Sequence, residues 1–195
     1  MMDTRFDLHD EPLTREEEQA LRNKRTGLAL FQFSWIMVFV SLIVANLQLR
    51  NQSASWPPPG VQELGAAVPT VMLVALVMSS FFARRGLSAL KGYQSRAALL
   101  QWRFALLLGV LFVIIMGIEW VRTPVTGQYS MVFRVMVAFH GIHALVIGVF
   151  MTFIERGMNS GFYNPRHFWP VEAAAKLWYF VTAAWFLFYL VIYWI

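Results

Sequence analysis

The sequence predicts an all-α integral membrane protein with five transmembrane helices. Hydrophobic residues make up 58% of the 195 positions and charged residues 14%, which leaves too few charges to cover a soluble domain of this size. Five stretches are long and apolar enough to cross a bilayer, because a spanning helix needs about 20 apolar residues. None of them alternates apolar and polar residues as a membrane β-strand does, so helices are the structure that satisfies the backbone in lipid.

The five predicted spans follow one another along residues 28–195, which we interpret as one membrane domain. They run approximately from Leu28 to Leu49, Leu64 to Ala83, Phe104 to Val121, Val135 to Ile154 and Leu177 to Ile195.

Residues 1–27 are a charged segment that we expect to lie in the cytoplasm as a solvated leader. Thr14 and Glu17 have the spacing of a capping box, and Glu18 and Arg22 are an ion pair at i, i+4. These features predict a short amphipathic helix from about Glu16 to Arg25. The leader has no apolar core with a small-residue cleavage site, so we do not interpret it as a cleaved secretory signal.

Basic residues are distributed by membrane side. The positive-inside rule places the N-terminus in the cytoplasm and the C-terminus outside, and the net charge of +5 therefore does not indicate a nucleic-acid partner. Five basic residues precede the first span (Arg5, Arg15, Arg22, Lys24, Arg25), five lie between the second and third spans (Arg84, Arg85, Lys91, Arg96, Arg103), and the outer segments carry Arg50, Arg122 and Arg134.

Small residues recur along the third predicted span. Ala105, Gly109 and Gly117 are separated by multiples of four residues, with Val113 between them. A stripe of this kind lets a neighbouring helix approach closely, so it predicts a packing face.

Two histidines lie at mid-membrane depth on one face of the fourth span. A bis-histidine haem needs ligands from opposite sides, whereas His140 and His143 are three residues apart and point the same way. Imidazoles at this depth are costly unless they are hydrogen-bonded. We therefore expect both rings to be buried with polar partners, in contact with other helices or a partner subunit, and we keep proton handling as an alternative.

Three further titratable residues complete the set of structural, lipid-related or proton-related candidates. Glu119 lies near the outer end of the third span, where Arg122 and Arg134 predict an interfacial ion pair. His167 and Glu172 lie at the inner end of the fifth span, too far from His143 for one metal ion. The carboxylate of Glu172 would favour the helix N-terminus. We expect no catalytic, cofactor-binding or metal-binding residues in this chain.

Cysteine is absent, which excludes disulfides, thiolate metal sites and iron–sulfur clusters. Together with the histidine spacing, this argues against electron transfer through the chain.

The C-terminal part of the chain carries a distinctive succession of motifs. They are Phe139-His140-Gly141-Ile142-His143, then His167-Phe168, then Glu172-Ala173-Ala174, closing on Tyr193-Trp194. This order resembles the end of subunit III of the haem-copper terminal oxidases, the cytochrome c oxidase family. Trp56-Pro57-Pro58-Pro59-Gly60 and Glu119-Trp120 extend the resemblance backwards over roughly residues 28–195. Five spans are typical of a short form that lacks the first two of seven helices.

The chain also departs from the family pattern. Trp35 stands where the family usually has a glutamate after Ser34, Met116 replaces a usual glutamine, and Lys176 replaces an aromatic residue. Tyr179-Phe180-Val181-Thr182 replaces His-Phe-Val-Asp. These departures weaken a role in proton collection and leave a scaffold role intact.

The resemblance implies a non-redox subunit of a bacterial-type plasma-membrane oxidase. Subunit I, with subunit II, would supply the haem and copper, and this chain would bind phospholipid and support assembly and durable proton-coupled oxygen reduction. The third subunit of a quinol oxidase or nitric oxide reductase fits the same motifs. A free-standing channel or transporter is a more distant alternative, since the sequence shows neither an internal repeat nor broken helices with midplane carboxylates.

Overall fold

The fold is a bundle of five long helices, described from a computed structural model for residues 14–61, 64–125 and 127–195. The predicted all-α fold with five spans is confirmed, since each helix is long and apolar enough to cross a membrane. The helices are α1 (Arg15–Asn51), α2 (Ala67–Lys91), α3 (Ser95–Arg122), α4 (Gly127–Asn159) and α5 (Trp169–Tyr193).

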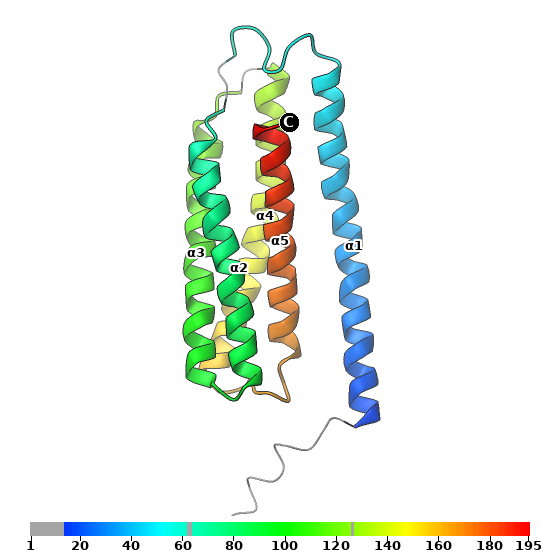
Figure 1. The fold of residues 1–195 in the computed structure, drawn as a ribbon, viewed down its shortest axis with the longest axis vertical. Coiled ribbons are helices and arrows are strands. Elements are labelled where there is room, and N and C mark those ends of the chain that lie inside the picture. The colour runs from blue at the N-terminus through cyan, green and yellow to red at the C-terminus, as the bar shows by residue number, and fades with distance from the viewer. Residues whose placement is uncertain (1–13, 62–63, 126) are drawn as a thin grey trace, which may run out of the picture.

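Helix α1 stands apart from the other four (Figure 1). It contacts α5 and α4 but neither α2 nor α3 over the described residues, whereas α2, α3, α4 and α5 pack on one another in a closed ring of neighbours. Its buried residues are Phe39 and Asn46, while α5 buries residues along most of its length. The molecule is therefore a four-helix core with one peripheral helix docked on α5.

The first helix is longer than the predicted span because the expected leader helix is continuous with it. Thr14 caps it through the predicted box: its hydroxyl accepts from the Glu17 amide at 3.2 Å, and the Glu17 carboxylate accepts from the Thr14 amide at 2.9 Å. No proline or glycine turn separates residues 16–25 from the membrane stretch, so the helix runs on without a break. Residues 1–13, including His9 and Arg5, lie outside the described part of the chain.

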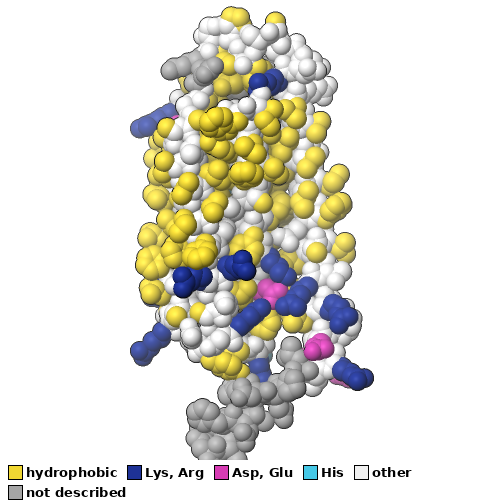
Figure 2. Space-filling model, in the orientation of Figure 1, with side chains coloured by type: hydrophobic (Ala, Val, Ile, Leu, Met, Phe, Trp, Pro, Cys, Tyr) yellow, Lys and Arg dark blue, Asp and Glu magenta, His cyan; other side chains and the backbone are white. Residues whose placement is uncertain are grey.

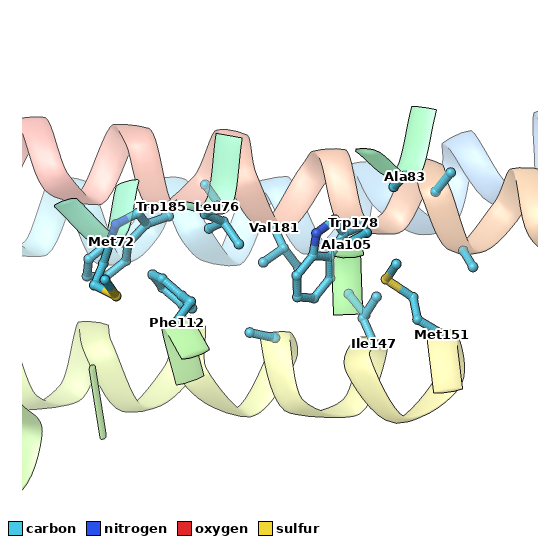
Figure 3. Packing of buried hydrophobic residues seen from close by; sticks show 14 of the residues in the cluster. Met72, Leu76, Ala83, Ala105, Phe112, Ile147, Met151, Trp178, Val181 and Trp185 are labelled. Carbon is cyan, nitrogen blue, oxygen red and sulfur yellow. The ribbon is translucent and has the colours of Figure 1, made fainter. Parts of the chain in front are cut away.

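A small polar network holds α2, α3 and α5 together inside the apolar core. The Ser79 hydroxyl donates to the Ala105 carbonyl oxygen at 2.7 Å, and the Trp178 indole N–H donates to the Ser79 oxygen at 2.8 Å. All three residues are buried, and Trp178 lies among Ala105, Val181 and Ile147 in Figure 3. Hydrogen bonds of this kind link helices that gain little from hydrophobic burial in lipid.

The predicted packing stripe on α3 is correct at two of its three positions. Ala105 is fully buried, and a Cβ at Gly109 would lie 2.6 Å from Cζ2 of Trp178, so only glycine permits this approach of the Trp178 ring. Gly117 has no atom within 4 Å of its Cβ position and is exposed. The buried part of the stripe therefore ends before Gly117.

Candidate functional site

His140 is enclosed by aromatic rings near the middle of the bundle. The residue is 1% exposed, and its ring makes an edge contact with Phe112 at 5.6 Å and a tilted contact with Trp185 at 5.1 Å between centroids. Phe39 and Phe188 complete the surround at 6.2 Å each. Four elements, α1, α3, α4 and α5, therefore meet on this one side chain.

The prediction that His140 has a polar partner is wrong for the described part of the protein. Neither Nδ1 nor Nε2 has a hydrogen-bond partner there, and the buried indole nitrogen of the adjacent Trp185 has none either. Contacts of ring edges and N–H groups with aromatic faces are weaker than hydrogen bonds. The sequence could not show this, because the apolar composition around His140 does not reveal which neighbours are rings and which could have been donors.

His143 lies one turn further along α4 in a partly buried position. Its Nδ1 is 2.7 Å from the Phe139 carbonyl oxygen. A carbonyl only accepts, so Nδ1 carries the proton and Nε2 is left as the acceptor. The Trp35 ring stands edge-on to the imidazole at 4.7 Å between centroids. The tryptophan that replaces the usual glutamate thus contacts one of the two intramembrane histidines.

A largely apolar cavity of about 270 Å³ lies between α3 and α4 beside His140. Gly117 lines it, which accounts for the open space at this end of the glycine stripe. Phe112, Met116, Val137 and Trp185 also contribute to its walls. The ring of His140 forms part of the wall, but its two nitrogens are buried, so the cavity presents little polar surface to an occupant.

At the end of the bundle where α3 ends and α4 begins, Arg134 does not pair with Glu119 as expected. Its guanidinium donates to the carbonyl oxygens of Trp120 and Thr123 at 2.8 and 2.9 Å and lies over the Trp120 ring at 3.9 Å from the centroid. Glu119 makes no ion pair with any residue of the described ranges. The C-terminal carbonyls of α3 satisfy the cation instead, because they are unpaired at the helix end.

At the opposite end of the bundle, where α5 begins, Glu172 is the centre of a cluster formed with Arg25, Lys91 and Lys176. We name these four residues the Glu172 cluster. Arg25 donates through Nε and one terminal nitrogen at 2.8 and 2.9 Å, and the two lysine Nζ atoms lie 3.0 and 2.9 Å from the carboxylate. Glu172 lies in the first turn of α5, as predicted, and its side chain is 5% exposed.

The sequence contained only part of this cluster. Lys176 is four residues after Glu172 on the same helix, a spacing that indicates a pair. Arg25 and Lys91 are 147 and 81 residues away in sequence, and only the packing of α1 and α2 against α5 brings them together. Our interpretation of Arg25 as part of a solvated leader is therefore incomplete: it is partly exposed, but it anchors α1 to α5.

His167 is exposed in the turn before α5, where its backbone N–H is held by Asn164. Within the described residues it contacts neither the intramembrane histidines nor the Glu172 cluster through a hydrogen bond, ion pair or ring contact. Over residues 14–61, 64–125 and 127–195, no three His, Asp or Glu side chains are grouped closely enough to hold a metal ion.

The described part of the chain has five apolar spans, an aromatic enclosure of a histidine midway along α4 and one buried carboxylate at one end. These features define a multi-pass membrane protein of the helical-bundle class. The family described as cytochrome c oxidase subunit III matches residues 12–195. The chain belongs to the cytochrome c oxidase subunit III family.

Named relatives agree with the family match. The chain is 27% identical over 172 residues to cytochrome c oxidase subunit 3 of Synechocystis sp., an alignment that covers 86% of this chain and 73% of the relative. It is 32% identical over 183 residues to the protein of the same name from Drosophila melanogaster, covering 87% and 68%. The relative from Thermostichus vulcanus is 29% identical over 171 residues, covering 86% and 85%.

Proposed function

We propose that this chain is the non-redox third subunit of a bacterial-type respiratory oxidase in the plasma membrane. Membership of the family implies a complex with other subunits. The haem and copper chemistry belongs to the catalytic subunit I, with subunit II as a further partner, and this chain binds phospholipid, supports assembly and prolongs turnover.

The enclosure of His140 is the observation that supports a structural role most directly. A proton carrier needs a partner from which to take a proton and another to which it can give one, within hydrogen-bond distance or through one water. The aromatic rings of Phe112, Trp185, Phe39 and Phe188 occupy the surroundings of His140. His143 is similarly committed through Nδ1 to its own helix. Both histidines thus pack helices together in this proposal.

The test is to purify the complete oxidase with wild-type chain, without the chain, and with His143→Phe. We expect the initial oxygen-consumption rate to be retained in all three preparations, and the preparation without the chain to lose activity sooner during turnover. His143→Phe should remain bound to the complex, because phenylalanine preserves the ring contact with Trp35. A fully assembled His143→Phe complex with its initial rate abolished would show that the residue takes part in the chemistry.

A further inference from the structure

The Glu172 cluster carries more positive charge than its carboxylate can neutralise. Three cations surround one anion, which leaves two positive charges in excess at one site. Arg25 uses two of its five N–H donors on Glu172, and each lysine ammonium uses one of its three. Unused donors remain on every one of the three cations.

These unused donors are accessible from outside the bundle. The side chains of Arg25, Lys91 and Lys176 are 43%, 39% and 38% exposed, whereas that of Glu172 is 5% exposed. Figure 2 shows Lys and Arg side chains gathered around an acidic one, just below the hydrophobic belt of the molecule. The cations therefore form the outer surface of the cluster, and the carboxylate lies beneath them.

The cluster opens onto a largely apolar helix surface that the rest of the described chain covers only in part, since Tyr179 is partly buried there while the residues beyond it are exposed. Its cations come from α1, α2 and α5, and α1 does not contact α2, so α5 lies uncovered between them. Tyr179, Ala183 and Phe186 follow Lys176 along this side of α5 at helical spacing. Ala183 is exposed and Phe186 is 47% exposed. We name Tyr179, Ala183 and Phe186 the α5 strip.

We propose that the Glu172 cluster binds the phosphate of an anionic phospholipid whose acyl chains lie along the α5 strip. Lys and Arg donors make strong charge-assisted hydrogen bonds to phosphate oxygens. Basic residues at the end of an apolar helix surface lie at the depth of the headgroups, where anionic lipids are attracted. This inference deepens the phospholipid binding proposed above by naming its site and its charge class.

An anionic headgroup fits the cluster better than a zwitterionic one. A headgroup with a net negative charge reduces the excess of two positive charges, whereas a choline headgroup adds a cation of its own. The expected preference is electrostatic and should weaken with added salt, because the cations are more than one-third exposed.

The experiment titrates the full chain in neutral detergent with phosphatidylglycerol or phosphatidylcholine and counts bound lipids by native mass spectrometry. We expect phosphatidylglycerol to bind more tightly, and Lys91→Met and Lys176→Met each to weaken it about fivefold, as expected for about 1 kcal/mol per surface cation. The matched control is Arg96→Met, which removes an exposed basic residue of α3 outside the cluster and should leave binding unchanged.

A second variant separates specific binding from a folding defect. Glu172→Gln removes the only anion of the cluster, so the three cations should bind an anionic headgroup with higher affinity. In nanodiscs we expect the stabilisation given by phosphatidylglycerol over phosphatidylcholine, measured as the shift in Tm, to be larger for Glu172→Gln than for the wild type. A folding defect alone would lower Tm equally in both lipids.

Two results of the lipid titration would contradict the proposals. Equal binding of the two lipids, or equal loss with Arg96→Met, would overturn the site proposed here. Such results would leave the proposed phospholipid binding in place. Failure of the wild-type chain to bind either lipid would contradict both proposals.

Discussion

The absence of a side chain at Gly109 decides how closely the Trp178 ring of α5 approaches α3. Trp178 fills the space where a Cβ would stand, with Cζ2 at 2.6 Å and Cη2 at 2.9 Å. The indole cannot easily turn away, because its N–H donates to Ser79, whose own hydroxyl donates to Ala105. A side chain at Gly109 would therefore have to displace both the ring and the network that orients it.

Gly109→Leu should destabilise the bundle by about 3 kcal/mol, the upper part of the usual range for overpacking a well-packed core. The measurement is thermal unfolding of the purified chain in detergent, together with the amount of the chain retained on the catalytic subunit. Gly117→Leu is the matched control, since its Cβ position is open and lines the cavity beside His140. Equal losses for the two variants would mean that the contact with Trp178 does not limit packing.

The sequence predicted the stripe but not its extent. Spacing by multiples of four places Ala105, Gly109 and Gly117 on one face of a helix, and it carries no information about how far the neighbouring helix follows that face. The same limit applies to Glu172: the lysine on its own helix is visible in the sequence, and the partners from α1 and α2 depend on packing.

Among the helices, α1 is held by few contacts for its length. In its N-terminal half Arg25 binds Glu172, and Gln32 donates to the Lys176 carbonyl oxygen at 3.1 Å. Deeper in the membrane, Phe39 is its one buried apolar residue. The Phe39 ring lies 5.0 to 5.3 Å, between centroids, from those of Phe139, Phe180, Phe188 and His143.

Phe39→Ala should loosen α1 from the other four helices. Aromatic pairs contribute about 0.5 to 1.5 kcal/mol each, and truncation of a buried phenylalanine costs about 3 to 5 kcal/mol in water-soluble cores. We expect a loss of about 2 to 3 kcal/mol here, since detergent solvates the exposed apolar surface. The measurement is the rate of protease cleavage in the α1–α2 connection, together with Tm.

Phe33→Ala serves as the control for Phe39→Ala, because Phe33 is on the same helix and is 61% exposed. Unchanged cleavage and Tm in Phe39→Ala, or equal changes in the control, would contradict the assignment of Phe39 as the main apolar anchor.

The number of helices followed directly from hydropathy, whereas their ends did not. The expected leader helix and first span are one helix of 37 residues, and α4 extends several residues beyond the predicted Val135–Ile154 at both ends. Hydropathy marks the part of a helix that lies in lipid. Capping and ion pairs, such as Thr14 with Glu17 and Arg103 with Glu155, support the polar turns beyond it.

At the scale of the whole molecule, charge divides the bundle into two unlike ends. All described basic residues except Arg50, Arg122 and Arg134 lie near the end formed by the start of α1, the α2–α3 turn and the α4–α5 connection. Figure 2 shows this concentration of Lys and Arg below the hydrophobic belt. Five crossings would put the start of α1 and the end of α5 on opposite sides of the membrane.

We predict that this basic end faces the cytoplasm, because Lys and Arg are retained on the cytoplasmic side during insertion. The cysteine-free chain allows a direct test with two exposed positions, Ala54→Cys after α1 and Gln94→Cys in the α2–α3 turn. A membrane-impermeant maleimide applied to spheroplasts should label Ala54→Cys at once and Gln94→Cys only after permeabilisation. The reverse pattern would place the basic end outside and would move the Glu172 cluster to the other leaflet. Labelling of both positions before permeabilisation would mean that α2 does not cross the membrane. A third exposed position, Ser160→Cys between α4 and α5, checks this result with the same reagent, because it lies at the same end of the bundle as Gln94.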